Sequence, residues 1–362
     1  MSKILFLVNH DVVIYNFRLE LAERLLAEGH RVIISSPYGE RIDDLKELGC
    51  EYHEITMSRR GMNPIRELVL IHQYKKLIRQ VSPDIVFSYT IKPNIYGAMA
   101  CKSMKVPCVA NITGLGTAVE NGGIIQKITT LLYKYAFSEI QRVYFQNTEN
   151  MQFFIDRNIA VDKHDLLPGS GVNLQRFCPL EYPSDEKIEF AFVSRIMREK
   201  GVDQYLEAAE YLRKKYPNTV FHVCGFCEQA YEDRLRELHE KGIIIYHGML
   251  KDIKPLMKDV HCTIHPTYYP EGISNVLLES CALARPIITT NRSGCREVVD
   301  DGVNGYVVKE KDSVDLIEKI ESFLRLSHEQ KQNMGLLGRA KVERQFDRNI
   351  VVEKYLSEVR KI

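Results

Sequence analysis

The chain alternates short, continuously apolar runs with longer helical patterns, and it does so in two separate series. The runs of the first series are Ile4–Val8, Arg31–Ser35, Asp84–Ser88, Val106–Asn111 and Arg142–Gln146. Those of the second are Ile188–Ser194, Thr219–Cys224, Ile243–Tyr246, Cys262–His265, Pro286–Thr290 and Tyr306–Val308. Such runs are typical of parallel strands that are buried on both faces by the helices between them. The sequence therefore predicts an α/β protein with two doubly wound, Rossmann-like domains.

A chain of 362 residues is too long for one ordinary hydrophobic core, which agrees with two domains. A stretch rich in proline and acidic residues around 176–187 has the composition of a linker. We therefore expect domains at residues 1–178 and 187–340, facing a cleft where ligands bind at the carboxyl ends of the strands. Residues 341–362 have a helical pattern and form a third segment, for which packing against the first domain is one option.

Composition excludes several classes of function. Forty-nine basic and 48 acidic residues give a net charge of +1, so the overall charge does not indicate a nucleic-acid partner. No apolar stretch approaches the roughly 20 residues that span a bilayer. The N-terminal run is short and lacks the pattern of a signal peptide. Nine cysteines without regular spacing fit a reducing compartment, so we expect a cytoplasmic protein.

The segment Pro270–Ser280 carries two carboxylates, Glu271 and Glu279, across a loop and the start of a predicted helix, Ser274–Leu283. A helix start binds anions such as phosphate, because its first N–H groups lack partners and its dipole is positive there. The two carboxylates can accept hydrogen bonds from a sugar and a ribose beside that phosphate. Alone, each acid also fits a structural role, as a helix cap or an exposed helix acid. As a set they predict a sugar-nucleotide site.

Two cations follow the predicted strand Ile188–Ser194. Arg195 and Lys200 lie in a loop that Gly201 closes before the next helix. The fork of an arginine and the point charge of a lysine can together neutralise a diphosphate. An isolated pair of this kind is more often an ordinary charged loop, and its position before the Glu271–Glu279 segment favours the diphosphate.

Three segments in this order, Ser194–Gly201, Pro270–Ser280 and Ser293–Gly305, resemble the retaining glycosyltransferases of family 4, which have the GT-B architecture. The resemblance covers essentially the whole chain. Within that family, Ile91–Gly97 and Asn111–Gly116 resemble bacterial enzymes that extend polyprenyl-diphosphate-linked sugars for capsule, O-antigen or protein glycosylation.

The resemblance implies roles for individual residues. Arg195 and Lys200 are expected to hold the donor diphosphate and, with Glu271, to form the catalytic set. Glu271 is expected to bind hydroxyls of the transferred sugar, as an electrostatic residue and not as a nucleophile. Glu279 is expected to hold the ribose. The remaining donor contacts implied are Leu250, within a segment along the uracil, and Gly272, Ile273, Ser274 and Asn275, near the sugar and the β-phosphate.

The first domain departs from the family pattern at two places. The loop after the first strand lacks the usual pair of glycines, and Asn16, with a helix starting at Phe17, is the proposed substitute. The segment Asn111–Gly116 lacks the usual histidine of the cleft, and Thr113 is its proposed replacement. His10 is the other polar candidate, although a lone histidine at a strand end is more often structural.

The segment Arg59–Arg79 holds six basic residues and one acid on an amphipathic pattern. It fits either a charged helix on a soluble domain or a patch that contacts anionic lipid. The candidates for binding the acceptor are Arg59, Arg60, Lys92 and Asn94. The expected partners are a UDP-sugar donor, a lipid-linked saccharide acceptor and the inner face of the membrane, to which the protein would bind peripherally.

No Asp-x-Asp sequence occurs, so we expect no metal site and no cofactor besides the UDP-sugar substrate. Cys224 and Cys227 have a metal-ligand spacing but lack a second pair. Two alternatives stay open: a hydrolase or epimerase of UDP-sugars, and a non-catalytic subunit that binds a nucleotide-sugar. A Rossmann oxidoreductase is disfavoured, because the glycines at 114 and 116 lack the third glycine of a dinucleotide fingerprint.

Overall fold

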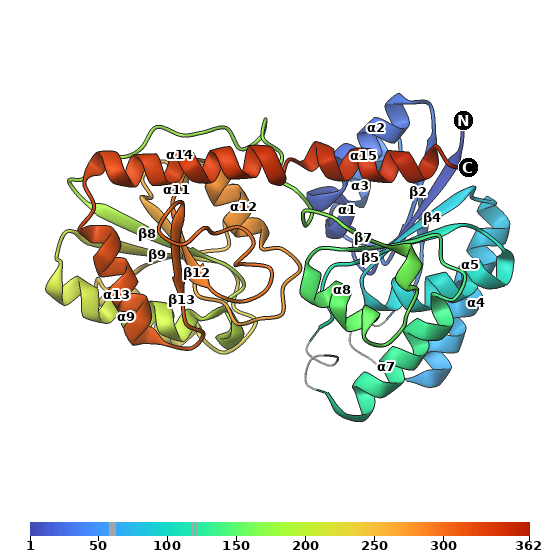
Figure 1. The fold of residues 1–362 in the computed structure, drawn as a ribbon, viewed down its shortest axis with the longest axis horizontal. Coiled ribbons are helices and arrows are strands. Elements are labelled where there is room, and N and C mark those ends of the chain that lie inside the picture. The colour runs from blue at the N-terminus through green and yellow to red at the C-terminus, as the bar shows by residue number, and fades with distance from the viewer. Residues whose placement is uncertain (58–62, 117–118, 120–121) are drawn as a thin grey trace. The chain divides into compact units, whose positions relative to one another are not determined.

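The computed structural model describes residues 1–57, 63–116, 119 and 122–362. The chain forms two compact units. The first consists of Met1–Gly171 together with Arg348–Ile362, and the second is Val172–Asp347. Residues 341–347 thus belong to the second unit and residues 348–362 to the first. Each unit contains one parallel sheet with helices on both faces, which confirms the predicted fold class (Figure 1).

The sheet of the first unit has the order β3-β2-β1-β4-β5-β6-β7, and all its neighbouring strands are parallel. Its strands are β1 (Lys3–Leu7), β2 (Arg31–Ser36), β3 (Glu51–Glu54), β4 (Ile85–Tyr89), β5 (Cys108–Ile112), β6 (Arg142–Phe145) and β7 (His164–Leu166). Its helices are α1 (Val12–Phe17), α2 (Leu19–Ala27), α3 (Ile42–Glu47), α4 (Pro64–Val81), the π-helical turn η1 (Pro93–Gly97), α5 (Ala98–Met104), α7 (Gly123–Ala136), α8 (Thr148–Ile155), the short 3-10 turn η2 (Val161–Lys163) and α15 (Arg348–Val359).

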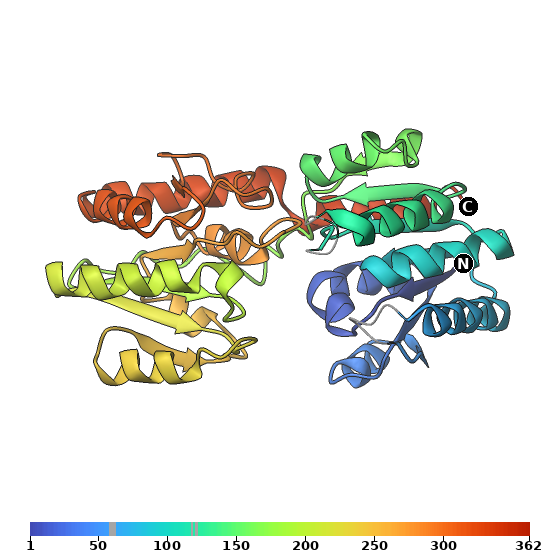
Figure 2. The same ribbon diagram turned by 90° about the horizontal axis from the view of Figure 1, so that it is seen from below.

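Alternate residues of the first unit's central strand pack on opposite sides of the sheet. Leu5 and Leu7 lie in a core with side chains of α4, α5, α7 and α8. Ile4 and Phe6 lie in a second core with side chains of α2, α3 and α15. Figure 2 shows α5 between α4 and α7, and α5 packs against both. This arrangement explains why every residue of β1 after the first is apolar and buried.

The sheet of the second unit has the order β10-β9-β8-β11-β12-β13 and is also entirely parallel. Its strands are β8 (Ile188–Val193), β9 (Thr219–Cys224), β10 (Ile245–Gly248), β11 (Cys262–His265), β12 (Ile287–Thr290) and β13 (Gly305–Val308). Its helices are the 3-10 turn η3 (Arg198–Lys200), α9 (Val202–Lys215), α10 (Glu232–Glu240), α11 (Lys254–Met257), α12 (Asn275–Ala282), α13 (Ser313–Leu324) and α14 (His328–Gln345). Helices α9, α10 and α13 cover one face, and α11, α12 and α14 cover the other.

One local prediction is wrong. The helix expected from Phe17 with Asn16 as its cap is instead two helices, α1 and α2, which meet at Arg18. Arg18 leaves helical geometry, with φ −139° and ψ 11°, and buries its guanidinium 5.1 Å from the ring centre of Tyr89 and 5.6 Å from that of Tyr355. Asn16 consequently lies inside α1, exposed, and caps no helix.

No helix among the described residues has the length and apolar character needed to cross a bilayer.

Candidate functional site

The predicted donor residues gather at the carboxyl end of the second sheet. Strand β8 pairs with both β9 and β11, so the loops that follow these three strands are neighbours. The backbone N–H of Tyr268, after β11, donates to the carbonyl oxygen of Glu199, after β8, at 2.9 Å. The sheet order therefore brings Arg195 and Lys200 beside Glu271, although more than 70 residues separate the two segments in sequence.

Lys200 and Glu271 form an ion pair at this site. The Nζ of Lys200 donates to Oε1 of Glu271, and the two side chains are only 8% and 17% exposed. The Nε2 of the buried His265, at the end of β11, lies 3.6 Å from the same Glu271 oxygen. Burial alone would raise the pKa of Glu271, but the Lys200 ammonium and His265 lower it to about 2. Glu271 is therefore ionised at neutral pH.

Arg195 is half-buried beside this pair. Its Nη1 donates to Oε2 of Glu228, in the loop after β9, at 2.5 Å. The ring of Tyr269 lies 5.1 Å from the Arg195 guanidinium carbon and 4.8 Å from Lys200 Nζ, so one aromatic ring is close to both cations. Both cations thus lie together at the sheet end, each beside a carboxylate that an anionic ligand can replace or join.

Two glycines permit this close packing of loops. Gly201 has φ +78°, and a Cβ there would lie 2.1 Å from the carbonyl oxygen of Pro266. Gly294, after β12, has φ +91°, and a Cβ there would lie 2.7 Å from Cβ of Glu271. Any larger residue at either position would push the Lys200 or Glu271 loop out of place.

One of the backbone N–H groups at the start of α12 is already hydrogen-bonded within the protein. Ser274 is the N-cap residue, and its backbone N–H donates to the carbonyl oxygen of Gly294 at 2.8 Å. This N–H is therefore not free for a phosphate in this structure, in contrast to our expectation. Gly272 and Ile273 are buried just before it, and Asn275 is half-buried at the first helical position.

The other two predicted donor residues lie on neighbouring elements of the same unit. Glu279 is half-buried in α12, between the buried residues Leu278 and Ser280. Leu250 is 37% exposed in the loop after β10. Just before it, the carbonyl oxygen of Gly248 accepts from the N–H of Gly225 at 2.8 Å.

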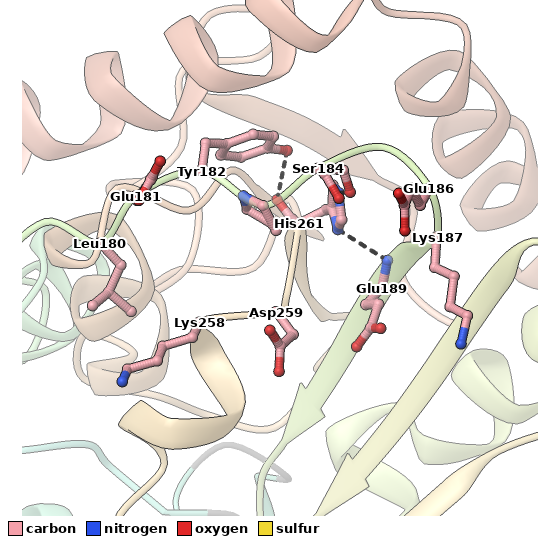
Figure 3. A pocket seen from close by; sticks show the side chains of 11 residues that line it. Leu180, Glu181, Tyr182, Ser184, Glu186, Lys187, Glu189, Lys258, Asp259 and His261 are labelled. Carbon is pink, nitrogen blue, oxygen red and sulfur yellow. Dashed lines mark hydrogen bonds between the residues drawn. The ribbon is translucent and has the colours of Figure 1, made fainter.

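A hollow of about 640 Å³ lies at the opposite, amino end of the same sheet (Figure 3). It is lined by Glu189 in β8 and by residues before β8 and β11, among them Lys258, Asp259 and His261. None of the predicted site residues lines it.

The acceptor candidates of the first unit differ from one another in burial. Asn94 is 1% exposed; its Oδ1 accepts from Ser88 Oγ and its Nδ2 donates to the carbonyl oxygen of Asn111, both at 2.8 Å. Both ends of its amide are used inside the protein, so we no longer expect Asn94 to contact an acceptor. Lys92 pairs with Oε1 of Glu67 at 2.5 Å.

Thr113 is half-buried directly after β5. His10, the alternative polar candidate, is close to the buried Asp11, with 2.5 Å between Nδ1 and Oδ1. Arg59 and Arg60 lie outside the described residues.

Two family models match the chain, one in each half. Residues 181–340 match the model described as glycosyl transferases group 1, and residues 3–147 match the model described as glycosyl transferase 4-like. The chain is a GT-B glycosyltransferase.

Solved structures agree with this fold. A glycosyltransferase from Rickettsia africae superposes with a TM-score of 0.84 at 21% identity, covering 99% of this chain and 98% of that one. Anabaena HepE, solved in complex with UDP and glucose, superposes with a TM-score of 0.81 at 17% identity, covering all of both chains.

Two curated relatives have names that specify lipid-linked acceptors. The N,N'-diacetylbacillosaminyl-diphospho-undecaprenol α-1,3-N-acetylgalactosaminyltransferase of Campylobacter jejuni is 26% identical, over 97% of this chain and 96% of the relative. The UDP-Gal:α-D-GlcNAc-diphosphoundecaprenol α-1,3-galactosyltransferase of Escherichia coli is 26% identical over 70% of this chain and 69% of the relative.

The sequence did not indicate three residues of the candidate site. Glu228 pairs with Arg195, His265 approaches Glu271, and Gly294 packs against the Glu271 loop. His265 ends an apolar strand, and a polar residue at that position is a usable signal. Glu228 has no comparable signal, because its partner is 33 residues away in sequence.

Proposed function

We propose that this glycosyltransferase moves a hexose or N-acetylhexosamine, with retention of configuration, from a UDP-sugar to a polyprenyl-diphosphate-linked saccharide. The observation that carries the proposal is the buried Lys200–Glu271 pair beside Arg195 at the carboxyl end of the second sheet. The printed activities of the two curated relatives and the UDP complex of Anabaena HepE support this choice of donor and acceptor.

Arg195 and Lys200 bind the donor diphosphate in this proposal. The Lys200 ammonium has three N–H donors, so it can keep Glu271 and still donate to a phosphate oxygen. Arg195 offers a planar fork that fits two phosphate oxygens and can leave Glu228 to do so. Both cations gain most when the sugar–phosphate bond breaks, because negative charge then accumulates on the leaving diphosphate.

Glu271 binds the transferred sugar. With a pKa of about 2 its carboxylate is ionised at neutral pH, so it accepts hydrogen bonds from hydroxyls and has no proton to give as an acid. It thereby holds the sugar beside the diphosphate that Lys200 binds. Gly272, Ile273 and Asn275 line the approach to the sugar; Ser274 supports them through its hydrogen bond to Gly294.

Glu279 holds the ribose hydroxyls, and the segment around Leu250 covers the base. The exposed Met249 and Leu250 support this assignment, because apolar side chains at the sheet end can pack on a flat ring.

The acceptor hydroxyl attacks the anomeric carbon on the face that the diphosphate leaves. The new bond joins the acceptor oxygen to that carbon, and the bond from the carbon to the phosphate oxygen breaks. The proton of the acceptor hydroxyl passes to an oxygen of the leaving diphosphate, and UDP is released. Arg195 and Lys200 supply the positive charge that a divalent ion supplies in other transferases. Thr113, Lys92 and Asn16 are the proposed contacts of the first unit to the acceptor.

Two helices of the first unit carry the proposed membrane-binding face. On α7 the exposed apolar residues Ile124, Ile128, Leu131 and Tyr135 repeat every three or four positions, which places them on one stripe. On α4 the exposed apolar residues are Ile65, Leu68 and Val69. Both helices cover the same face of the sheet, on either side of α5.

The charges of these helices fit an anionic membrane. Helix α7 contains two lysines and no acid, and α4 contains four basic residues and one acid, Glu67, which is buried. An apolar stripe flanked by cations binds anionic bilayers, and each cation near the surface contributes about 1 kcal/mol. We therefore propose that the glycosyltransferase works peripherally on the cytoplasmic face of the membrane, where its lipid-linked acceptor is anchored.

The reaction is tested by incubating the purified protein with a panel of UDP-sugars and lipid-linked acceptors, with and without EDTA. We expect acceptor-dependent release of UDP, a product heavier by one sugar in mass spectrometry, and no loss with EDTA. Release of free sugar or an epimer without acceptor would instead indicate a hydrolase or epimerase. Binding of a UDP-sugar without turnover would indicate a non-catalytic subunit.

The membrane face is tested by co-sedimentation with vesicles of neutral or partly anionic lipid. We expect binding to anionic vesicles only, and its loss in the variant Ile128→Ser/Leu131→Ser. The matched control is Leu336→Ser/Leu337→Ser, which changes two exposed leucines of α14 in the second unit. Equal binding of both variants and the original protein would contradict the assignment to α7.

A further inference from the structure

Three side chains form a hydrogen-bonded chain across three neighbouring strands of the second sheet. Oε2 of Glu189 on β8 lies 2.8 Å from Nε2 of His222 on β9. Nδ1 of His222 lies 3.0 Å from Nε2 of His247 on β10. His222 is 5% exposed, and His247 is half-buried with its ring 5.2 Å from the ring of His222.

The chemistry of the three side chains limits which atoms donate in these hydrogen bonds. A carboxylate oxygen can only accept, so Nε2 of His222 donates to Glu189. Nδ1 of His222 and Nε2 of His247 share the second hydrogen bond, in which one of the two nitrogens donates to the other. Burial, together with His222 and His239, lowers the pKa of His247 below its ordinary value. The two hydrogen bonds therefore connect His247 through His222 to Glu189.

At the other end of the hydrogen-bonded chain, the backbone of Glu189 is hydrogen-bonded to His261. The N–H of Glu189 donates to Nδ1 of His261 at 3.1 Å, as Figure 3 shows, and the N–H of His261 donates back to the carbonyl oxygen of Glu189 at 2.7 Å. These two hydrogen bonds hold the backbone of Glu189 in place, and its carboxylate in turn positions His222.

The His247 end lies at an irregularity of β10. Tyr246 pairs with Val223 and Gly248 pairs with Cys224, so His247 is an extra residue in its strand, a β-bulge. Bulges bend a strand and re-aim the residues that follow it. Here the next residue, Gly248, has φ +63°, and its carbonyl oxygen accepts from the N–H of Gly225.

Gly225 connects the bulge to the loops of the donor site. A Cβ on Gly225 would lie 1.7 Å from the carbonyl oxygen of Ser194, so its backbone lies directly against the residue before Arg195. The loop after Gly225 carries Glu228, whose N–H donates to the carbonyl oxygen of Ile196 at 3.0 Å. A shift of the bulge therefore reaches both partners of the Arg195–Glu228 pair.

We propose that His247 is a positioning residue for donor binding, held by His222 and Glu189, which sets the bulge of β10 and through it the place of Arg195. This inference rests on the proposed function, because it takes Arg195 as a ligand of the donor diphosphate. It implies that loss of the hydrogen-bonded chain weakens donor binding and raises KM. Because Arg195 contributes most when the sugar–phosphate bond breaks, kcat should fall as well.

The test compares two substitutions of the same residue. In His247→Gln the side-chain amide takes the place of Nε2 and can still form a hydrogen bond with His222; in His247→Asn it takes the place of Nδ1 and cannot. We expect His247→Asn to raise both KM for the UDP-sugar and the dissociation constant of UDP by about fivefold, and to lower kcat by about fivefold. We expect His247→Gln to stay within about twofold of the original protein in all three values.

A double variant shows whether the effect passes through the chain. His222→Gln keeps the contact to Glu189 but loses the one to His247, so His222→Gln/His247→Asn should be no worse than either single variant. The control is His328→Asn, which removes an exposed histidine paired with Asp185 in the same unit and should leave KM unchanged. Additive effects in the double variant would overturn the proposal.

Calorimetric titration with UDP separates this inference from the function on which it rests. If the original protein does not bind UDP, both fail. If the original protein binds UDP and His247→Asn binds it equally well, or if His247→Gln is as weak as His247→Asn, the positioning role alone is overturned.

Discussion

At the carboxyl end of the first sheet, the amide of Asn94 is hydrogen-bonded at both ends to Ser88 and Asn111 and is closed off from solvent. At the carboxyl end of the second sheet, Lys200 and Glu271 pair with each other, and Arg195 pairs with Glu228 while remaining half-buried. The two sheets share one parallel topology. A neutral network with every group satisfied stabilises one structure, whereas ion pairs between loops can exchange a partner for a charged ligand. The comparison supports our proposal that the second unit binds the donor.

The largest effect on activity is expected for Lys200→Ala, which tests whether the ion pairs of the second unit bind the donor. We expect kcat/KM to fall on the order of 1,000-fold, because one of two cations that stabilise the leaving diphosphate is lost. UDP release in the presence of acceptor measures it. The control is Lys331→Ala, since Lys331 is also buried and ion-paired, to Asp185, but lies outside the site. A loss below about tenfold in Lys200→Ala would count against its role.

The pH dependence of stability sharpens the comparison. Glu271 has a pKa of about 2 in the folded protein against an ordinary value of 4.5, so its contribution is complete above pH 4.5 and is lost as the pH falls toward 2. Glu271→Gln should remove this contribution, at most about 3 kcal/mol, and flatten the decline of stability in acid. Urea unfolding from pH 7 to pH 3 measures it. Glu237→Gln, at a solvent-exposed ion pair with Lys241, should change the curve little.

A smaller effect is expected for Glu279→Ala. Loss of the ribose contact should raise KM for the UDP-sugar about tenfold with little change in kcat, because the contact is the same before and during the reaction. Steady-state kinetics with the donor varied decide this. Glu318→Ala removes an exposed acid from α13 and serves as the control. If both variants had the same kinetics, Glu279 would have no role in binding the ribose.

The smallest effect tests the first unit. Asn94→Ala should lower the free energy of unfolding by about 1 kcal/mol or somewhat more, since Ser88 and the Asn111 carbonyl lose a buried partner. The kcat/KM of the folded variant should stay within about twofold. If the variant had unchanged stability and a raised KM for the acceptor, we would conclude instead that Asn94 binds the acceptor.

The sequence predicts the buried strands of both sheets and the edge strands β10 and β13 of the second sheet, but it misses β3 and β7, the edge strands of the first sheet. Central strands such as β1 and β8 are covered on both faces, so their residues are apolar almost without interruption. Strands β3 and β7 form the two edges of the first sheet and read Glu-Tyr-His-Glu and His-Asp-Leu, a composition that indicates no strand. The break at Arg18 was equally hidden, because it depends on the rings of Tyr89 and Tyr355, which are remote in sequence.

The same distinction applies to the site. Arg195, Lys200 and Glu271 follow buried strands in recognisable segments, so the sequence indicates them as a set. Their neutralising partners cannot be predicted in the same way: the pairing of Arg195 with Glu228 depends on how the loops after β8 and β9 interlock. The role of the Ser274 N–H likewise depends on the position of Gly294, which only the folded loops determine.

The most direct test of the central claim is the affinity of the protein for UDP relative to uridine, measured by calorimetric titration. We predict that the original protein prefers UDP by about 100-fold or more, and that Arg195→Ala/Lys200→Ala reduces this preference below about tenfold while binding uridine equally well. An unchanged preference for UDP in the double variant would show that these two cations do not hold the diphosphate.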